Sequence, residues 1–133
     1  MGLPFWKLTP HSATIPYEPL AVAYWSRVMM EQGALLVLEV DGKVVGAVGA
    51  IISPSLGNLE YLVGAEMFWW IEPAHRSAGA GLALLTAVEQ AMREKGVKLF
   101  SMIAIETIDP DRVGAIYERS GYKRTERTYT KEL

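Results

Sequence analysis

The sequence contains no cysteine, only two histidines, and no apolar run of the roughly 18–20 residues that a membrane-spanning helix needs. Without cysteine the chain has no disulfide, no thiolate metal site and no cysteine nucleophile. His11 and His75 lack the paired spacing of metal ligands, so no metal site is predicted. A formal net charge of −2 without a basic stripe argues against a nucleic-acid partner. We therefore expect a cytoplasmic protein that binds neither membrane nor nucleic acid.

The composition is that of one ordinary globular domain. The chain has 133 residues, of which 50% are hydrophobic and 21% are charged. This length supports one sizeable core and predicts a single domain over residues 1–133. Residues 1–16 contain three prolines and show no periodicity, so we expect them to form an irregular N-terminal arm.

The next segments predict a helix and an antiparallel meander. Apolar residues repeat with helical spacing over residues 17–32, and Gly33 is expected to end that helix. Short apolar runs then follow at 35–40, 44–52 and 61–71. Asp41-Gly42 separates the first two runs, and this dipeptide is typical of a tight hairpin.

The second half predicts alternating helices and strands. A helix is expected over residues 81–95, with Leu82 on its apolar stripe, followed by a buried strand at 97–105. A helix that connects two buried strands makes a crossover, so strands 61–71 and 97–105 should be parallel. Asp109 should cap a helix that ends near Ser120, and residues 122–133 read as an exposed edge strand. The pattern predicts an α+β (mixed α/β) fold with one central sheet.

A glycine-containing turn between strand 61–71 and the next helix carries the chemistry. Gly79 and Gly81 allow a ligand to approach the backbone closely, and the helix N-terminus offers N–H groups and a favourable dipole. Arg76 adds a positive charge, so the turn fits a pyrophosphate. The dinucleotide-binding fingerprint requires glycine where the chain has Leu84, and no Gly-Lys-Ser/Thr occurs. A simple strand-to-helix turn remains the alternative on the glycines alone.

Two motifs together resemble the GNAT superfamily of N-acetyltransferases. Arg-x-x-Gly-x-Gly at 76–81, after a strand that ends in Ile-x-Pro, is similar to motif A of that superfamily. Tyr117-Glu118-x-x-Gly121-Tyr122 is similar to its downstream signature. The resemblance covers residues 17–133. It implies a GNAT-like fold whose fourth and fifth strands, here 61–71 and 97–105, are parallel and splay apart to admit acetyl-CoA as co-substrate.

The resemblance also implies roles for particular residues. The backbone of Trp70 and Ile71 would hold the pantetheine amides, and the main chain of the following turn would hold the pyrophosphate: Arg76, Ser77, Ala78, Gly79, Ala80, Gly81 and Leu82. Tyr117 would donate a proton to the departing thiolate, or it only packs on the sheet. Glu66 is the favoured general base. Glu72, Glu106, or a rim carboxylate that only attracts the amine are the alternatives.

Two departures from the family pattern bear on assembly and cofactor binding. The strand that usually opens such domains is missing, which leaves strand 35–40 with an open edge that a partner chain could cover in a homodimer. A shortened N-terminus is the other explanation. Residues 106–109 also lack the asparagine that contacts pantetheine in many relatives.

The expected function is N-acyl transfer, with an acetyl group passing from acetyl-CoA to a primary amine; the residues leave open whether a larger acyl group is used. The amine belongs to a small molecule or a protein and attacks directly in a ternary complex, because no cysteine is available for a covalent intermediate. A non-catalytic acyl-CoA sensor and an interaction domain without cofactor binding are the alternatives.

Overall fold

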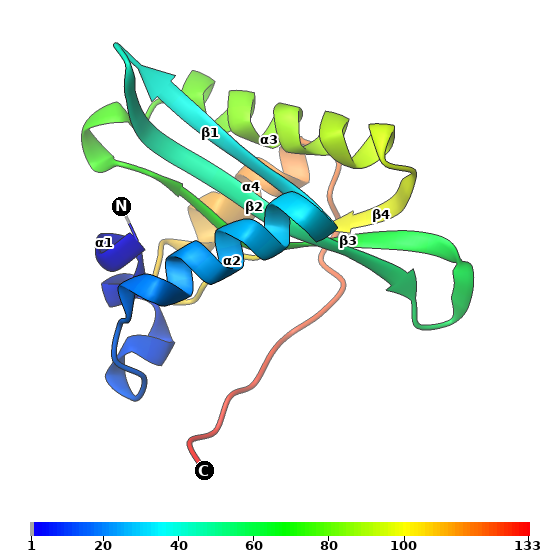
Figure 1. Ribbon diagram of the computed structural model, residues 1–133, viewed down its shortest axis with the longest axis horizontal. Coiled ribbons are helices and arrows are strands. Elements are labelled where there is room, and N and C mark those ends of the chain that lie inside the picture. The colour runs from blue at the N-terminus through cyan, green and yellow to red at the C-terminus, as the bar shows by residue number, and fades with distance from the viewer. Residues whose placement is uncertain (1) are drawn as a thin grey trace. The chain divides into compact units, whose positions relative to one another are not determined.

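The computed structural model describes residues 2–133, except for the side chain of Ala78, so Met1 of the predicted arm lies outside the described residues. Its contacts divide the chain into two compact units. The first unit comprises Glu18–Ile103 together with Gly2, and the second comprises Leu3–Tyr17 and Ala104–Leu133. Helices accompany a single sheet, so the predicted α+β class is confirmed (Figure 1).

The sheet of the first unit has the strand order β1-β2-β3-β4. Its strands are β1 (Gly33–Val40), β2 (Lys43–Ser55), β3 (Asn58–Ile71) and β4 (Val97–Ser101). The first three pair antiparallel, whereas β3 and β4 pair parallel. The predicted meander and parallel pair are therefore confirmed, although β4 ends four residues before the expected limit at 105. Among the described residues β1 pairs only with β2, which makes it an edge strand.

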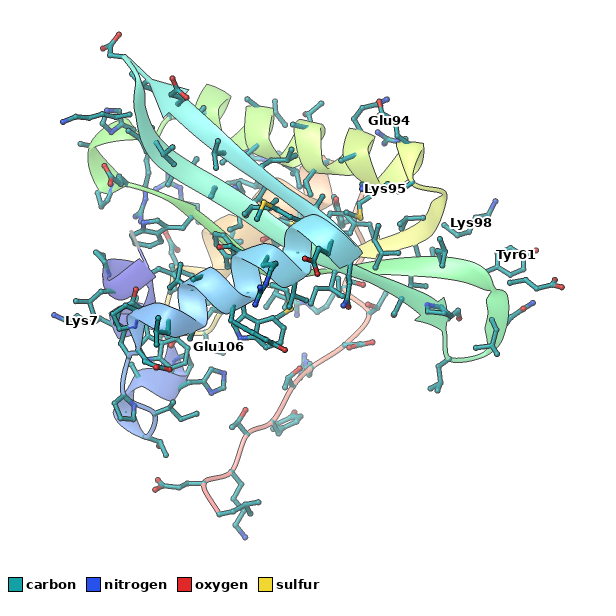
Figure 2. The ribbon with its side chains drawn as sticks, viewed as in Figure 1. Lys7, Tyr61, Glu94, Lys95, Lys98 and Glu106 are labelled. Atoms are coloured by element: carbon teal, nitrogen blue, oxygen red, sulfur yellow. The ribbon has the colours of Figure 1, made fainter. Side chains whose placement is uncertain are left out.

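The β1–β2 turn follows the chemistry of its two residues. Asp41 and Gly42 both have positive φ, at 49° and 77°. Two successive left-handed residues suit the right-handed twist of the flanking strands, which explains why Asp-Gly favours this hairpin. The β2–β3 hairpin is longer. It turns at residues 56–57, pairs with β1 only up to Ile51, and meets β4 only from Leu62 onward. Its tip therefore projects beyond the sheet (Figure 1), and Tyr61 lies on this projection (Figure 2).

Two helices of the first unit, α2 (Pro19–Gln32) and α3 (Ala78–Glu94), cover the sheet on its two faces (Figure 1). The fully buried side chains of α3 are Leu85, Val88 and Met92, with Leu84 almost as deep. Met29 of α2 packs so closely on Gly49 that a β-carbon there would lie 2.2 Å from its sulfur. Leu82 is 52% exposed, so its predicted place on the buried stripe of α3 is wrong.

In the second unit, the structure differs from two predictions, one for each end of the chain. Residues of the expected irregular arm form α1 (Gly2–Leu8) and the 3₁₀ helix η1 (Pro10–Ala13). Proline is tolerated in a first helical turn, where its missing N–H needs no partner. The indole nitrogen of Trp6 donates to the carbonyl of Ile15 at 2.9 Å, and Thr107 donates to Leu8. The unit also contains α4 (Pro110–Arg119).

Residues 122–133 form no strand, contrary to the prediction. Nearly all of them are exposed, and a strand is stable only where a neighbour satisfies its backbone. No helix among the described residues combines the length and the apolar character that a bilayer crossing requires.

Candidate functional site

The two parallel strands stop pairing before β3 ends, and we call this point the fork. The last paired residues are Ala65 of β3 and Ser101 of β4, whereas β3 continues to Ile71. Near the fork the register with β2 moves from Glu66↔Ala50 to Phe68↔Gly49, so Met67 is an extra residue on β3. Such a bulge bends a strand and increases its twist. The bulge thus coincides with the separation of β3 from β4.

Beyond the fork the β2 register decides which way the backbone of β3 faces. The N–H of Glu72 donates to the carbonyl of Val45 at 2.8 Å, and Ile71 stands opposite Gly46 in the adjacent position. Opposed residues in an antiparallel pair alternate between bonding each other and facing outward. Ile71 therefore directs its N–H and C=O away from β2, toward the side on which β4 pairs, whereas Trp70 directs its own toward β2. The register favours Ile71 over Trp70 as a backbone partner for a ligand at the fork.

Arg76 is held in place by the end of β3. Its Nε donates to the carbonyl of Ile71 at 2.8 Å, and its guanidinium carbon lies 4.4 Å from the ring centroid of Trp70. The flat guanidinium suits such stacking and retains further N–H donors for an anion. The sequence predicted the charge of Arg76 at the turn. It could not predict that this side chain ties the turn back to β3 through Trp70 and Ile71.

The turn that follows opens α3 with a side-chain cap. Ser77 accepts a hydrogen bond from the N–H of Ala80 at 3.1 Å, and its carbonyl accepts from Gly81 at 3.2 Å. The cap does not use the N–H groups of Ala78 and Gly79, which also belong to the first turn. A β-carbon on Gly79 would meet nothing closer than the Ser77 hydroxyl at 4.0 Å. The segment thus offers a helix N-terminus with two uncapped donors and open space beside Gly79.

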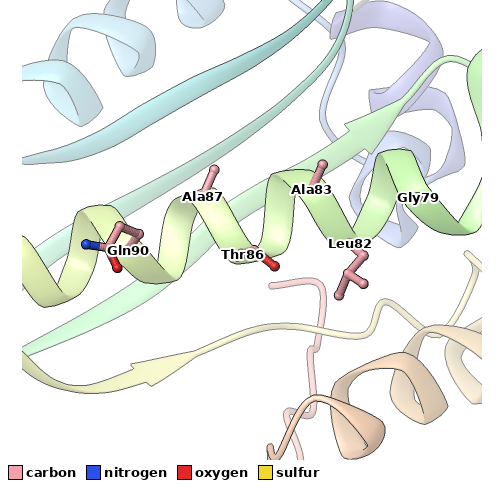
Figure 3. Close-up of a pocket in the computed structure, with 6 residues that line it drawn as sticks. All are labelled: Gly79, Leu82, Ala83, Thr86, Ala87 and Gln90. Carbon is pink, nitrogen blue, oxygen red and sulfur yellow. The ribbon is translucent and has the colours of Figure 1, made fainter.

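Leu82 lines a shallow hollow of about 520 Å³ along the exposed face of α3. Figure 3 shows its lining residues, which follow one another at helical spacing: Gly79, Leu82, Ala83, Thr86, Ala87 and Gln90. None of these carries a charge, and the only side-chain hydrogen-bond donors among them are the hydroxyl of Thr86 and the amide of Gln90. The hollow therefore adds surface to the predicted turn but no further charged group.

Glu66 is the one buried carboxylate beside the fork among the described residues. Glu66 is only 5% exposed to solvent, and one of its carboxylate oxygens accepts a hydrogen bond from the N–H of Ile103 at 2.7 Å. Burial raises the pKa of Glu66 from 4.5 to about 7, although the hydrogen bond from Ile103 opposes this shift. A carboxylate with such a pKa can accept a proton near neutral pH.

The alternative carboxylates are more exposed. The side chain of Glu72 is 44% exposed, and one of its oxygens lies 4.0 Å from Nδ1 of His75. Both residues line a second hollow of about 600 Å³ beside the β1–β2 turn, together with Asp41 and Lys43. Neither this hollow nor the one along α3 is lined by Glu66 or Ile71. Glu106 is exposed and belongs to the second unit (Figure 2). Among residues 2–133, no cluster of histidine and carboxylate side chains could hold a metal ion.

Tyr117 lies in α4 of the second unit and is 7% exposed. Its ring centroid lies 5.7 Å from that of Tyr122, and its carbonyl accepts a hydrogen bond from the N–H of Tyr122 at 3.0 Å. The two tyrosines of the downstream motif thus pack on each other within that unit. The fork, the turn and Glu66 all belong to the first unit.

The residue that sequence reasoning missed is Ile103. It acts through its backbone N–H, which every residue except proline carries, so no residue type signals it. No residue type in the sequence indicates the bulge at Met67 either.

Comparison with known proteins places these features in a family. The model of the acetyltransferase (GNAT) family matches residues 5–122. A search of curated proteins finds no match. Among solved structures, an acetyltransferase of Trypanosoma brucei superposes with a TM-score of 0.70 at 22% identity, and the match covers 97% of this chain and 90% of that one.

Two further solved structures carry related names. An aminoglycoside acetyltransferase from an uncultured soil sample has a TM-score of 0.70 at 18% identity, with 92% of this chain and 78% of that chain covered. AAC(6')-Iy, in complex with the bisubstrate analogue CoA-S-monomethyl-acetylneamine, has a TM-score of 0.69 at 17% identity, with 98% and 90% covered. These likenesses show the fold.

Proposed function

The chain belongs to the acetyltransferase (GNAT) family, and from this premise we propose that it transfers an acetyl group from acetyl-CoA to a primary amine. The observation that supports the proposal best is the fork. The β3–β4 pairing ends at Ala65–Ser101, and beyond it Ile71 directs its backbone N–H and C=O to the side on which an extended ligand would lie. Pantetheine is an extended chain with two amides, so it can pair with a strand edge of this kind.

The turn after β3 is suited to the pyrophosphate. The uncapped N–H groups of Ala78 and Gly79 stand at the N-terminus of a helix of 17 residues, where the dipole favours an anion. Arg76 adds a guanidinium that Trp70 and Ile71 already orient. Ala80, Gly81 and Leu82 continue the first turns of α3, where a β-carbon on Gly81 would lie 3.4 Å from the ring of Trp69.

The chemistry requires two proton transfers around one acyl transfer. The amine nitrogen attacks the thioester carbonyl carbon, the carbon–sulfur bond breaks, and the coenzyme leaves as a thiolate. Glu66, whose pKa is raised to about 7 by burial, takes the proton from the amine directly or through water. By its position in the family motif, Tyr117 protonates the thiolate. Transfer occurs in one ternary complex, so bringing the two reactants together is the main contribution to rate.

A thermal-shift titration with acetyl-CoA tests the cofactor site. We expect millimolar acetyl-CoA to raise the melting temperature of the wild type by several degrees, because a ligand of the folded state stabilises it. An Arg76→Ala, Gly79→Ala variant should lose this shift. An added β-carbon at position 79 has ordinary van der Waals room, so the variant should still fold.

A matched control removes the same residue types elsewhere. Arg93 is exposed at the end of α3, and a β-carbon on Gly57 would meet nothing within 4 Å. An Arg93→Ala, Gly57→Ala variant should keep the full shift. Release of free CoA thiol in the presence of candidate amines then separates an enzyme from an acyl-CoA sensor. The absence of any shift in the wild type would contradict the proposal and favour an interaction domain.

A further inference from the structure

The fork contains a hydrogen bond that ordinary strand pairing does not explain. Continuing the register of Ala65↔Ser101 would place Ile103 opposite Met67, and the N–H of Ile103 would then bond to the adjacent backbone of β3. The pairing stops before this point, and the bulge at Met67 redirects β3. The N–H of Ile103 donates instead to the side chain of Glu66, at 2.7 Å.

Glu66 is suited to this contact by its place and its burial. It precedes the bulge by one residue, and the contact reaches a segment 37 positions later in the chain. Both residues belong to the first unit. A hydrogen bond to a carboxylate is stronger than one between neutral groups, and it is screened little where the acceptor is buried. The side chain therefore ties β3 to the segment after β4 at the point where their backbones separate.

We propose that Glu66 is a positioning residue, which fixes the opening of the fork by holding the backbone of Ile103 and thereby prepares the fork for acetyl-CoA. This role rests on the proposed function and is separate from that of a general base. A base needs an ionisable carboxylate, whereas a positioning residue needs only a hydrogen-bond acceptor of the right length.

Two substitutions of similar length separate the roles. Glu66→Gln keeps an acceptor oxygen for Ile103 but cannot act as a base, and Glu66→Met fills similar volume with a poor acceptor. Calorimetric titration with CoA should give the Gln variant an affinity within about twofold of the wild type. The Met variant should bind about tenfold more weakly, as expected for loss of one hydrogen bond to a carboxylate. Equal affinities in the two variants would overturn the positioning role.

Amide hydrogen exchange at Ile103 provides a readout that does not depend on the cofactor. The amide should be protected in the wild type and in Glu66→Gln, and it should exchange at least tenfold faster in Glu66→Met. Unchanged exchange in the Met variant would contradict the proposal. If the wild type failed to bind CoA while the exchange pattern held, the proposed function would be wrong and Glu66 would still hold the fork.

A third variant removes the donor instead of the acceptor. Ile103 lies in a segment without regular secondary structure, and Ile103→Pro deletes its N–H while leaving Glu66 intact. Steady-state kinetics should show KM for acetyl-CoA raised about tenfold with kcat changed less than threefold. An unchanged KM would count against the role of Glu66 at the fork. This variant also decides the question if Glu66→Met does not fold.

Discussion

Glu66 couples the stability of the folded protein to pH. In the folded state burial raises its pKa from 4.5 to about 7. Between these values the folded chain binds a proton that the unfolded chain has released, so stability falls as pH rises. The contribution is fully present below about pH 4.5 and is lost above about pH 7. Since one pKa unit corresponds to about 1.4 kcal/mol, the loss amounts to about 3 kcal/mol.

Glu66→Gln should remove this pH dependence, because glutamine does not ionise. Urea unfolding at pH 5 and pH 8 should show a smaller difference in unfolding free energy for the variant than for the wild type. Glu72→Gln is the control, since its side chain is 44% exposed. The same difference between pH 5 and pH 8 in wild type and Glu66→Gln would show that Glu66 titrates normally.

The proposed role of Tyr117 as the general acid can be tested by a single substitution. If its phenol protonates the thiolate, Tyr117→Phe should lower kcat by about 100-fold, which is the low end for general acid catalysis. The ring itself remains, so the packing against Tyr122 is kept. Tyr122→Phe removes the neighbouring hydroxyl and serves as the control. Equal kcat values for these two variants would leave Tyr117 with a packing role only.

At the scale of elements, the β1–β2 turn depends on a backbone conformation that few residues adopt. Gly42 has a φ of 77°, and an added β-carbon there would meet nothing within 4 Å. Gly42→Ala should therefore cost about 1 kcal/mol through backbone strain alone. Chemical denaturation measures this cost. Gly57→Ala, in the turn of the other hairpin, has the same open space without a positive φ, and it should change stability by less than half as much.

The elements predicted correctly are those whose signals are local. Asp41-Gly42 fixes a hairpin through its own dihedral preferences, and α3 is marked by regular apolar spacing over many turns. Gly33 does end a helix, but the structure adds another reason for glycine there. A β-carbon at that position would lie 2.0 Å from the carbonyl oxygen of Ala50 on the neighbouring strand.

The elements predicted wrongly depend on distant partners. The expected strand at 122–133 has no strand beside it in its unit, and the expected irregular arm is held by contacts such as that between Thr107 and Leu8. Asp109 does occupy the N-cap position of α4, with Pro110 in the first turn, as predicted. Its backbone is left-handed, however, and it makes no side-chain cap bond, while its carbonyl accepts from Val113.

The candidate site also contains features that the sequence predicts and features that it does not predict. The turn at 76–81 could be predicted because glycines, an arginine and a helix start occur together in the sequence. The cap by Ser77 and the tie from Arg76 to Ile71 are local contacts that depend on how the turn folds, and the contact between Glu66 and Ile103 joins segments 37 positions apart. All three contacts use a backbone group as the partner, which the sequence cannot mark, and the cap by Ser77 also occupies the N–H of Ala80, a donor that the motif offers to the ligand.

At the scale of the whole molecule, length and composition predict one cooperative domain, whereas the contacts divide into two compact units. Scanning calorimetry should show a single transition whose calorimetric and van't Hoff enthalpies agree. Gly42→Ala in the first unit should lower its midpoint. Gly114→Ala, inside α4 of the second unit and with open space around it, should raise the same midpoint by a few degrees. Two transitions, each moved by only one variant, would contradict the single domain.

The second unit joins segments from both ends of the chain, so its contacts form late during synthesis. Thr107 holds Leu8 across 99 positions of the chain, and Thr14 reaches Glu132 across 118. A ribosome that adds about 5–20 residues per second needs about 5–20 s to pass from Leu8 to Thr107. During that interval all of Glu18–Ile103 is synthesised. Leu8 must meanwhile wait on the nascent chain for Thr107, whereas Trp6 donates to Ile15, which is made almost at once. The contacts between the two ends of the second unit can therefore form only after the whole of Glu18–Ile103 has been synthesised.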